Sequence, residues 1–164
     1  MIFNLLKKKH PKNQLVACAD GIVEPMEKAD DEVFSSKVLG DGVVIKPSSN
    51  VLVSPVDGTV VMLMKDSLHA LAVKDKNGME IMLHVGIDTV SMNGEGFKAL
   101  VEINDDVKKG QALLTFDRKK IAERGFSDQI MMILTNAQEF GHVEFFSKIE
   151  AEAGKTIVSE YECK

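Results

Sequence analysis

The sequence predicts an all-β protein, an antiparallel β-sandwich or barrel with one or two short helices. Short β-branched runs alternate along the chain with turn signals rich in Gly, Pro, Asn and Asp. The runs occupy residues 43–45, 51–53, 60–61 and 81–83, and the turn signals occupy residues 40–42, 47–50, 55–58, 77–78 and 109–110. Many short strands at this spacing are typical of sandwiches and barrels.

Little helix is expected. Asp117 can cap a short helix over residues 118–124, and Gly125 can end it in a left-handed conformation. A helical turn is expected near residues 136–140. The rest of the chain is expected to form strands and loops.

Length and composition indicate one soluble domain. The chain has 164 residues, 45% of them hydrophobic and 27% charged, and no apolar run long enough to span a bilayer. No secretory signal begins the chain, which predicts a cytoplasmic protein. The net charge of −5 argues against a general nucleic-acid binder, which needs a basic face. Cys18 and Cys163 lack metal-type spacing and are expected to be free thiols in a reducing compartment.

The first residues differ from the rest. We expect residues 1–15 to form a flexible tail and residues 16–164 to form the domain. Residues 1–9 join an apolar cluster to three lysines, so a weak contact with a membrane surface is the alternative to a disordered tail.

The most informative stretch, residues 67–90, predicts a hairpin that brings two histidines together. Apolar runs flank the turn signal at residues 75–78, and His69 and His84 lie 15 residues apart with their midpoint inside that turn. A two-residue turn there would make the histidines direct cross-strand neighbours. A bulge at Gly78 would shift the register by one residue and still leave them close.

Alternation along the second strand of this hairpin predicts where the side chains point. Met79, Ile81, Leu83 and Val85 share a wholly apolar face that should meet the core. His84 then lies with Met82 on the accessible face. Two imidazoles on an open, otherwise apolar face suggest a use, because such a surface is costly to expose.

The chemistry that fits such a pair is phosphoryl transfer. A neutral imidazole is a nucleophile near neutral pH, and a second imidazole can donate an N–H to a phosphate oxygen. A hydroxyl such as that of Ser67 can hold the second ring in the required tautomer. An apolar surround would slow hydrolysis of the phosphorylated ring.

A metal site is the rival use of the histidines. His84 and Asp88 have the HxxxD spacing of some zinc peptidases, but no HxH pair supplies a third ligand. The other histidines are His10, in the tail, and His142, which stands alone. No native metal is therefore expected, although adventitious zinc could bind at His69 and His84.

The stretch GMEIMLHVGIDTV, residues 78–90, resembles the phosphorylation-site signature of the glucose-type enzyme IIA family of the bacterial sugar phosphotransferase system. That signature is a Gly, two variable residues, three apolar residues, His, an apolar residue, Gly, an apolar residue, any residue, Thr and an apolar residue. Every constrained position is met. Further blocks that resemble the family lie at residues 33–47, 54–60, 94–102 and 110–117, so the resemblance covers roughly residues 16–160.

The resemblance implies a fold and a set of roles. The fold would be a barrel-sandwich hybrid, also called a duplicated hybrid motif. The phosphocarrier HPr would donate a phosphoryl group to His84, and a cysteine of an enzyme IIB domain would receive it during sugar uptake. His69 would stabilise the phosphate, and Ser67, which stands where the family commonly has Thr, would orient His69. No cofactor is expected.

The resemblance also implies a partner-binding surface. Phe34, Met82 and Val85 would supply apolar contacts, with Met82 standing where the family often has an aromatic residue. Asp31 and Asp88 would meet arginines of the partners.

Two other functions stay open. One is a regulatory module that binds permeases or metabolic enzymes according to its phosphorylation state, and a zinc hydrolase is less favoured. The sugar, and whether the chain stands alone or belongs to a larger one, are not indicated, although the N-terminal segment favours a free-standing protein.

Overall fold

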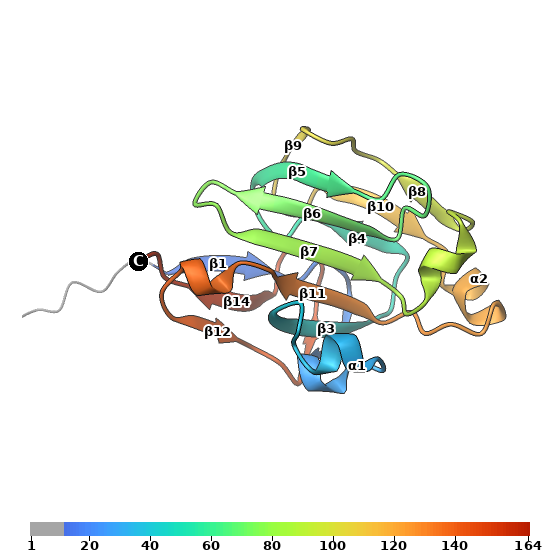
Figure 1. Ribbon diagram of the computed structural model, residues 1–164, viewed down its shortest axis with the longest axis horizontal. Coiled ribbons are helices and arrows are strands. Elements are labelled where there is room, and N and C mark those ends of the chain that lie inside the picture. The colour runs from blue at the N-terminus through green and yellow to red at the C-terminus, as the bar shows by residue number, and fades with distance from the viewer. Residues whose placement is uncertain (1–11) are drawn as a thin grey trace, which may run out of the picture.

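The computed structural model describes residues 12–164 as three antiparallel sheets (Figure 1). One sheet has eight strands in the order β13-β2-β3-β11-β7-β6-β5-β9, and the smaller sheets have the orders β1-β14-β12 and β4-β10-β8. The predicted all-β sandwich is therefore confirmed. The strands are Asn13–Val16 (β1), Gly21–Pro25 (β2), Asp41–Pro47 (β3), Val51–Val53 (β4), Gly58–Leu63 (β5), Ala70–Asp75 (β6), Glu80–Val85 (β7), Phe97–Ala99 (β8), Asp106–Val107 (β9), Ala112–Phe116 (β10), Ile130–Leu134 (β11), Val143–Phe145 (β12), Ile149–Ala151 (β13) and Ile157–Tyr161 (β14).

The helices are short. Helix α2, Arg118–Glu123, is capped by the Asp117 carboxylate, which accepts from the Lys120 N–H, and Gly125 follows it at φ +81°. Together with the 3₁₀ turn η3, Ala137–Glu139, this confirms both predicted helical segments.

Three further helical segments lie where strand or loop was expected, so that expectation is wrong. They are η1 (Met26–Lys28), α1 (Glu32–Ser35) and η2 (Thr89–Met92). Each is a single turn, which is too short to show a helical period in the sequence.

The domain begins earlier than predicted. β1 pairs with β14, with Asn13 opposite Tyr161, and Leu15 is fully buried. The expected boundary after residue 15 therefore falls inside a strand. The remainder of the predicted tail, with its apolar and lysine clusters, lies outside the described residues.

The main core fills the space between the large sheet and the two small sheets. Leu71, Leu83 and Val85 of the large sheet pack there with Leu114 of β10 and Val158 of β14. Burying these side chains supplies the dominant favourable term in folding.

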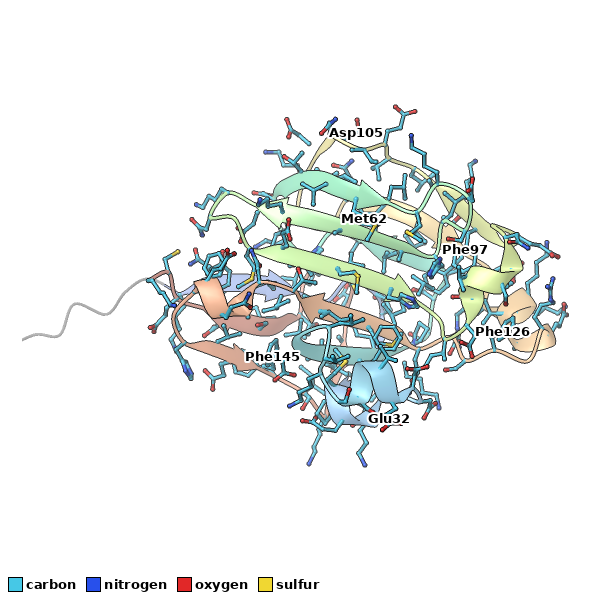
Figure 2. The ribbon with its side chains drawn as sticks, in the orientation of Figure 1. Glu32, Met62, Phe97, Asp105, Phe126 and Phe145 are labelled. Atoms are coloured by element: carbon cyan, nitrogen blue, oxygen red, sulfur yellow. The ribbon has the colours of Figure 1, made fainter. Side chains whose placement is uncertain are left out.

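A second apolar cluster, the outer cluster, covers the opposite face of the large sheet's central strands. In Figure 1 the segment carrying η1 and α1 lies across β3, and Glu32 marks α1 in Figure 2. Because layers cover both faces of the sheet here, all five residues of β11 are buried. The outer cluster contains Met26, Ala29, Phe34, Val44, Ile87, Met131 and Ile133, with Met82 packed against it.

Across residues 12–164, no helix is long and apolar enough to cross a membrane. Cys18 is buried and Cys163 is exposed, and both are free, as predicted.

A buried tyrosine ties the histidine-bearing hairpin to the small sheet at the chain ends. The Tyr161 hydroxyl donates to the Asp75 carboxylate and accepts from the Asn77 side-chain amide at 3.0 Å. Burial and the bond to Asp75 both raise the pKa of the Tyr161 phenol. Because Asp75 and Asn77 belong to the β6–β7 turn, the C-terminal strand fixes that turn in place.

Replacing Tyr161 by Phe keeps the ring and removes both hydrogen bonds. We expect the free energy of unfolding in urea to fall by about 1–3 kcal/mol, because Asp75 loses a partner in a half-buried site. Thr59→Ala is the control: it removes an exposed hydrogen bond to Asp106 and should cost less than about 0.5 kcal/mol. Equal losses in the two variants would contradict the role of the tyrosine hydroxyl.

Candidate functional site

His69 and His84 meet at the edge of the outer cluster. Their ring centroids lie 4.7 Å apart and the rings are nearly perpendicular, with an interplanar angle of 85°. His84 belongs to β7, and His69 immediately precedes β6. The predicted histidine pair is therefore present.

The pair is not formed by direct cross-strand opposition. In the β6–β7 ladder the residue opposite His84 is Ala70, so the two-residue-turn register was wrong by one residue. Gly78 has φ +90°, and the Asp75 N–H bonds to the Met79 carbonyl across a three-residue turn. This is the shift that a bulge at Gly78 produces.

The faces of β7 are those that its alternation predicted. Ile81, Leu83 and Val85 point into the main core, and Met82 and His84 point to the other side. That other side is less open than expected, because the outer cluster covers part of it. His84 is half-buried and His69 is only 5% exposed.

Ser67 holds the His69 ring, in the position predicted for it. Its hydroxyl lies 2.6 Å from Nδ1 of His69, and both residues are buried. Because this bond occupies Nδ1, Nε2 is the ring nitrogen left for another partner. A hydrogen bond to one nitrogen sets the tautomer and orientation of an imidazole.

Phe34 forms the apolar wall beside His84. The two ring centroids lie 4.8 Å apart, with an interplanar angle of 56°. Phe34 is carried by α1, whose first turn is capped by the Asp31 carboxylate accepting from the Val33 N–H at 2.8 Å. The cap therefore positions the aromatic ring as well as the carboxylate.

The other predicted partner-binding residues divide into two groups. Met82 is half-buried against the outer cluster, and Asp88 is exposed just after β7 at φ +62°. Val85 is fully buried in the main core. Its side chain cannot contact a partner, so its assignment to the binding surface was wrong.

Burial depresses the basicity of both imidazoles. Desolvation, followed by the neighbouring His69 ring, lowers the pKa of His84 to about 4. The main chain of Gly86 and the Asp31 carboxylate offset part of this fall. Desolvation also lowers the pKa of His69. Both rings are therefore neutral at pH 7, the form in which an imidazole nitrogen has a free lone pair.

The nitrogens of His84 differ in their surroundings. Nδ1 is buried and, within residues 12–164, has no hydrogen-bond partner of ordinary geometry. The ring nitrogen Nδ1 therefore faces the protein interior, on the side of the ring nearest the main chain of Gly86.

Gln129 is a site residue that the sequence did not indicate. Its side chain accepts from the Asp30 N–H at 2.8 Å and donates to the Lys28 carbonyl at 3.2 Å, so it holds the loop before α1. Its own carbonyl accepts from the Gly86 N–H at 2.7 Å, two residues after His84. A single glutamine in a loop gives no sequence signal that predicts these hydrogen bonds.

Among the described residues, the site supplies two imidazoles but no third metal ligand. In the part of the chain that the structure describes, no group of three His, Cys, Asp or Glu side chains is arranged to hold a metal ion. Catalytic zinc sites ordinarily use three protein ligands. The geometry thus gives the zinc-hydrolase alternative no support.

The sequence of this chain matches a known protein family and individual proteins over most of its length. Residues 13–140 match the sequence profile of the family described as phosphoenolpyruvate-dependent sugar phosphotransferase system, EIIA 1. A glucose-specific EIIA component from Bacillus cereus is 38% identical over 97% of this chain and 96% of its own.

Two further proteins place the domain in context. A glucose-specific EIIBCA component from Corynebacterium glutamicum is 33% identical over 88% of this chain, which spans only 21% of that longer protein. The solved structure of glucose permease IIA from Mycoplasma capricolum superposes with a TM-score of 0.77 and 30% identity, covering 92% of this chain and 96% of its own.

The low pKa of His84 predicts a stability that depends on pH. Its pKa of about 4 in the folded chain lies below the ordinary value of about 6.5, so the unfolded chain binds more protons between these values. The stabilisation is complete above about pH 6.5, and by pH 4.5 the free energy of unfolding should fall by about 2–3 kcal/mol. His84→Gln should lose this part of the dependence in urea titrations at pH 7 and 4.5.

His142→Gln, a change at an exposed histidine, is the matched control and should behave like the natural sequence. An unchanged pH dependence in His84→Gln would show that this ring does not titrate as described.

Proposed function

The chain belongs to the EIIA 1 family of the phosphoenolpyruvate-dependent sugar phosphotransferase system, and from this membership we propose that His84 carries the phosphoryl group during sugar uptake. The observation that carries the proposal is the contact between a half-buried, neutral His84 and a second imidazole held by Ser67. A phosphocarrier needs a nucleophile of this kind with a donor beside it.

Nε2 of His84 is the nitrogen that attacks. Nδ1 is buried, which leaves Nε2 as the nitrogen a donor can reach. In the transfer, a bond forms between Nε2 and phosphorus while the bond from phosphorus to the donor's histidine nitrogen breaks. The low pKa of His84 keeps the Nε2 lone pair available at neutral pH.

His69 stabilises the phosphoryl group without carrying it. With Nδ1 engaged by Ser67, the ring can donate an Nε2–H to a phosphate oxygen. Phe34 and the outer cluster exclude water from one side of His84. Slower attack by water preserves the phosphohistidine until the acceptor arrives.

We infer that exposed apolar side chains on α1, which carries Phe34, and on η2, which follows β7, form the docking surface. Val33 on α1, Val38 after it and Val90 on η2 are 50%, 73% and 51% exposed. Asp31 caps α1 and Asp88 directly precedes η2, and both would pair with basic side chains of partners. We assign this surface to HPr as donor and to an enzyme IIB domain as acceptor, in keeping with the fused EIIBCA relative.

The same surface gives a regulatory role a physical basis. A phosphoryl group on His84 would add about 1.5–2 negative charges at an apolar contact surface. A permease or metabolic enzyme that docks on Val33, Val38 and Val90 would then be released. This role can coexist with transfer, because both use one face in different states.

Labelling tests the carrier. With phospho-HPr as donor, we expect His84→Ala to lose the label completely, because no other ring takes the group. His69→Gln should still accept it but pass it to an IIB domain at least tenfold more slowly. Full labelling of His84→Ala would refute the assignment of the carrier.

A pull-down tests the regulatory role. Candidate permeases and metabolic enzymes should bind the unphosphorylated chain and be released by phosphorylation. Val38→Asp should weaken this binding, and Val61→Asp, an exposed change on β5, is the control. Equal capture of these proteins by the phosphorylated and the unphosphorylated chain would exclude a regulatory role that depends on phosphorylation.

A further inference from the structure

The ring of His69 does not lie where the strand ladder would place it. Ala70 is opposite His84, so continuing the ladder puts His69 opposite Val85. The main chain keeps this register, since the Val85 N–H donates to the His69 carbonyl at 2.8 Å. Directly opposed residues share a face, and Val85 faces the main core. Strand alternation alone would therefore bury His69 on the face away from His84.

A left-handed turn immediately before His69 removes it from that alternation. Leu68 has φ +56°, and the chain bends at His69 before β6 begins. The Leu68 N–H donates to the Met64 carbonyl at 2.7 Å, and the Met64 N–H donates to the Ala70 carbonyl at 3.0 Å. These bonds close a compact loop in which residue 68 occupies the left-handed position of an αL motif.

Leucine is an unfavourable residue for this position. Glycine or asparagine ordinarily fills it, because a bulky side chain clashes with its own main chain at positive φ. The side chain of Leu68 packs against the main core, which offsets the backbone strain. Strained residues that the surroundings hold in place concentrate at functional sites.

We propose that Leu68 is a positioning residue, whose left-handed backbone, held by its contact with the main core, turns the His69 ring out of the ladder and onto His84. The inference deepens the proposed function, because it assigns the part of the chain that sets the phosphate-stabilising ring. Leu68 touches neither the phosphoryl group nor His84 in this account. It acts through the direction in which His69 leaves the loop.

The test uses substitutions that separate backbone conformation from side-chain packing. Leu68→Asn retains a residue that tolerates positive φ, whereas Leu68→Val introduces a β-branched side chain that does not. We expect nuclear Overhauser effects between the His69 and His84 ring protons in Leu68→Asn and their loss in Leu68→Val. Transfer to an IIB domain should be near normal in Leu68→Asn and at least tenfold slower in Leu68→Val.

A double variant excludes a general loss of structure. In the His69→Gln background, Leu68→Val should slow transfer no further, because the ring that it misplaces is already absent. If Leu68→Val folds poorly, Leu68→Ala replaces it in the comparison. Leu68→Ala and Leu68→Asn both lose the packing of leucine, and we expect weaker contact between the His69 and His84 rings in Leu68→Ala than in Leu68→Asn.

The results distinguish failure of the positioning role of Leu68 from failure of the function proposed for His69. Retained ring contact in Leu68→Val, or an equal loss in Leu68→Asn, would overturn the positioning role of the Leu68 backbone. Lost ring contact with normal transfer would support that role and instead refute the proposed function of His69.

Discussion

The perpendicular contact between two neutral imidazoles is the feature on which the rest of the site depends. It requires His69 and His84 to be partly dehydrated, because exposed rings would be hydrated and free to turn. The main core cannot provide this environment, since His84 points away from it. The outer cluster does so by covering the second face of the large sheet, and it brings the Phe34 ring against His84. The segment with η1 and α1 is therefore as much a part of the site as the hairpin.

Two distant parts of the chain hold that segment and the hairpin in place. Gln129 bonds the loop before α1 with its side chain and the residue after β7 with its carbonyl. At the far end, Tyr161 fixes the β6–β7 turn. Each contact joins segments that are distant in sequence, so the site is a property of the whole sandwich.

Much of the fold and part of the candidate site could be predicted from residue patterns in the sequence. The alternation of residues 79–85 determined which face of β7 meets the core, because one polar residue on the wrong face would be costly. The spacing of His69 and His84 about a Gly-containing turn predicted that they meet.

The register was off by one residue because a three-residue turn with Gly78 at positive φ resembles a two-residue turn in sequence. Phe34 was indicated by the family resemblance alone, whereas Ser67 was indicated first by the tautomer that His69 needs and then by the resemblance. The Ser67 hydroxyl lies 2.6 Å from Nδ1 of His69, and the Phe34 and His84 ring centroids lie 4.8 Å apart. Val85 was misplaced because its position in the motif reflects packing in the core. Helix α1 and Gln129 were missed because one capped turn and one glutamine become significant only when tertiary contacts bring them to the histidines.

The pairing of β1 with β14 affects how this domain can be built into other proteins. Asn13 lies opposite Tyr161, so the chain enters and leaves the sandwich at one edge, well away from α1 (Figure 1). A module with adjacent entry and exit points can be spliced between other segments without stretching its sheets. A connection made at that edge would leave the face that carries α1 and the two histidines uncovered.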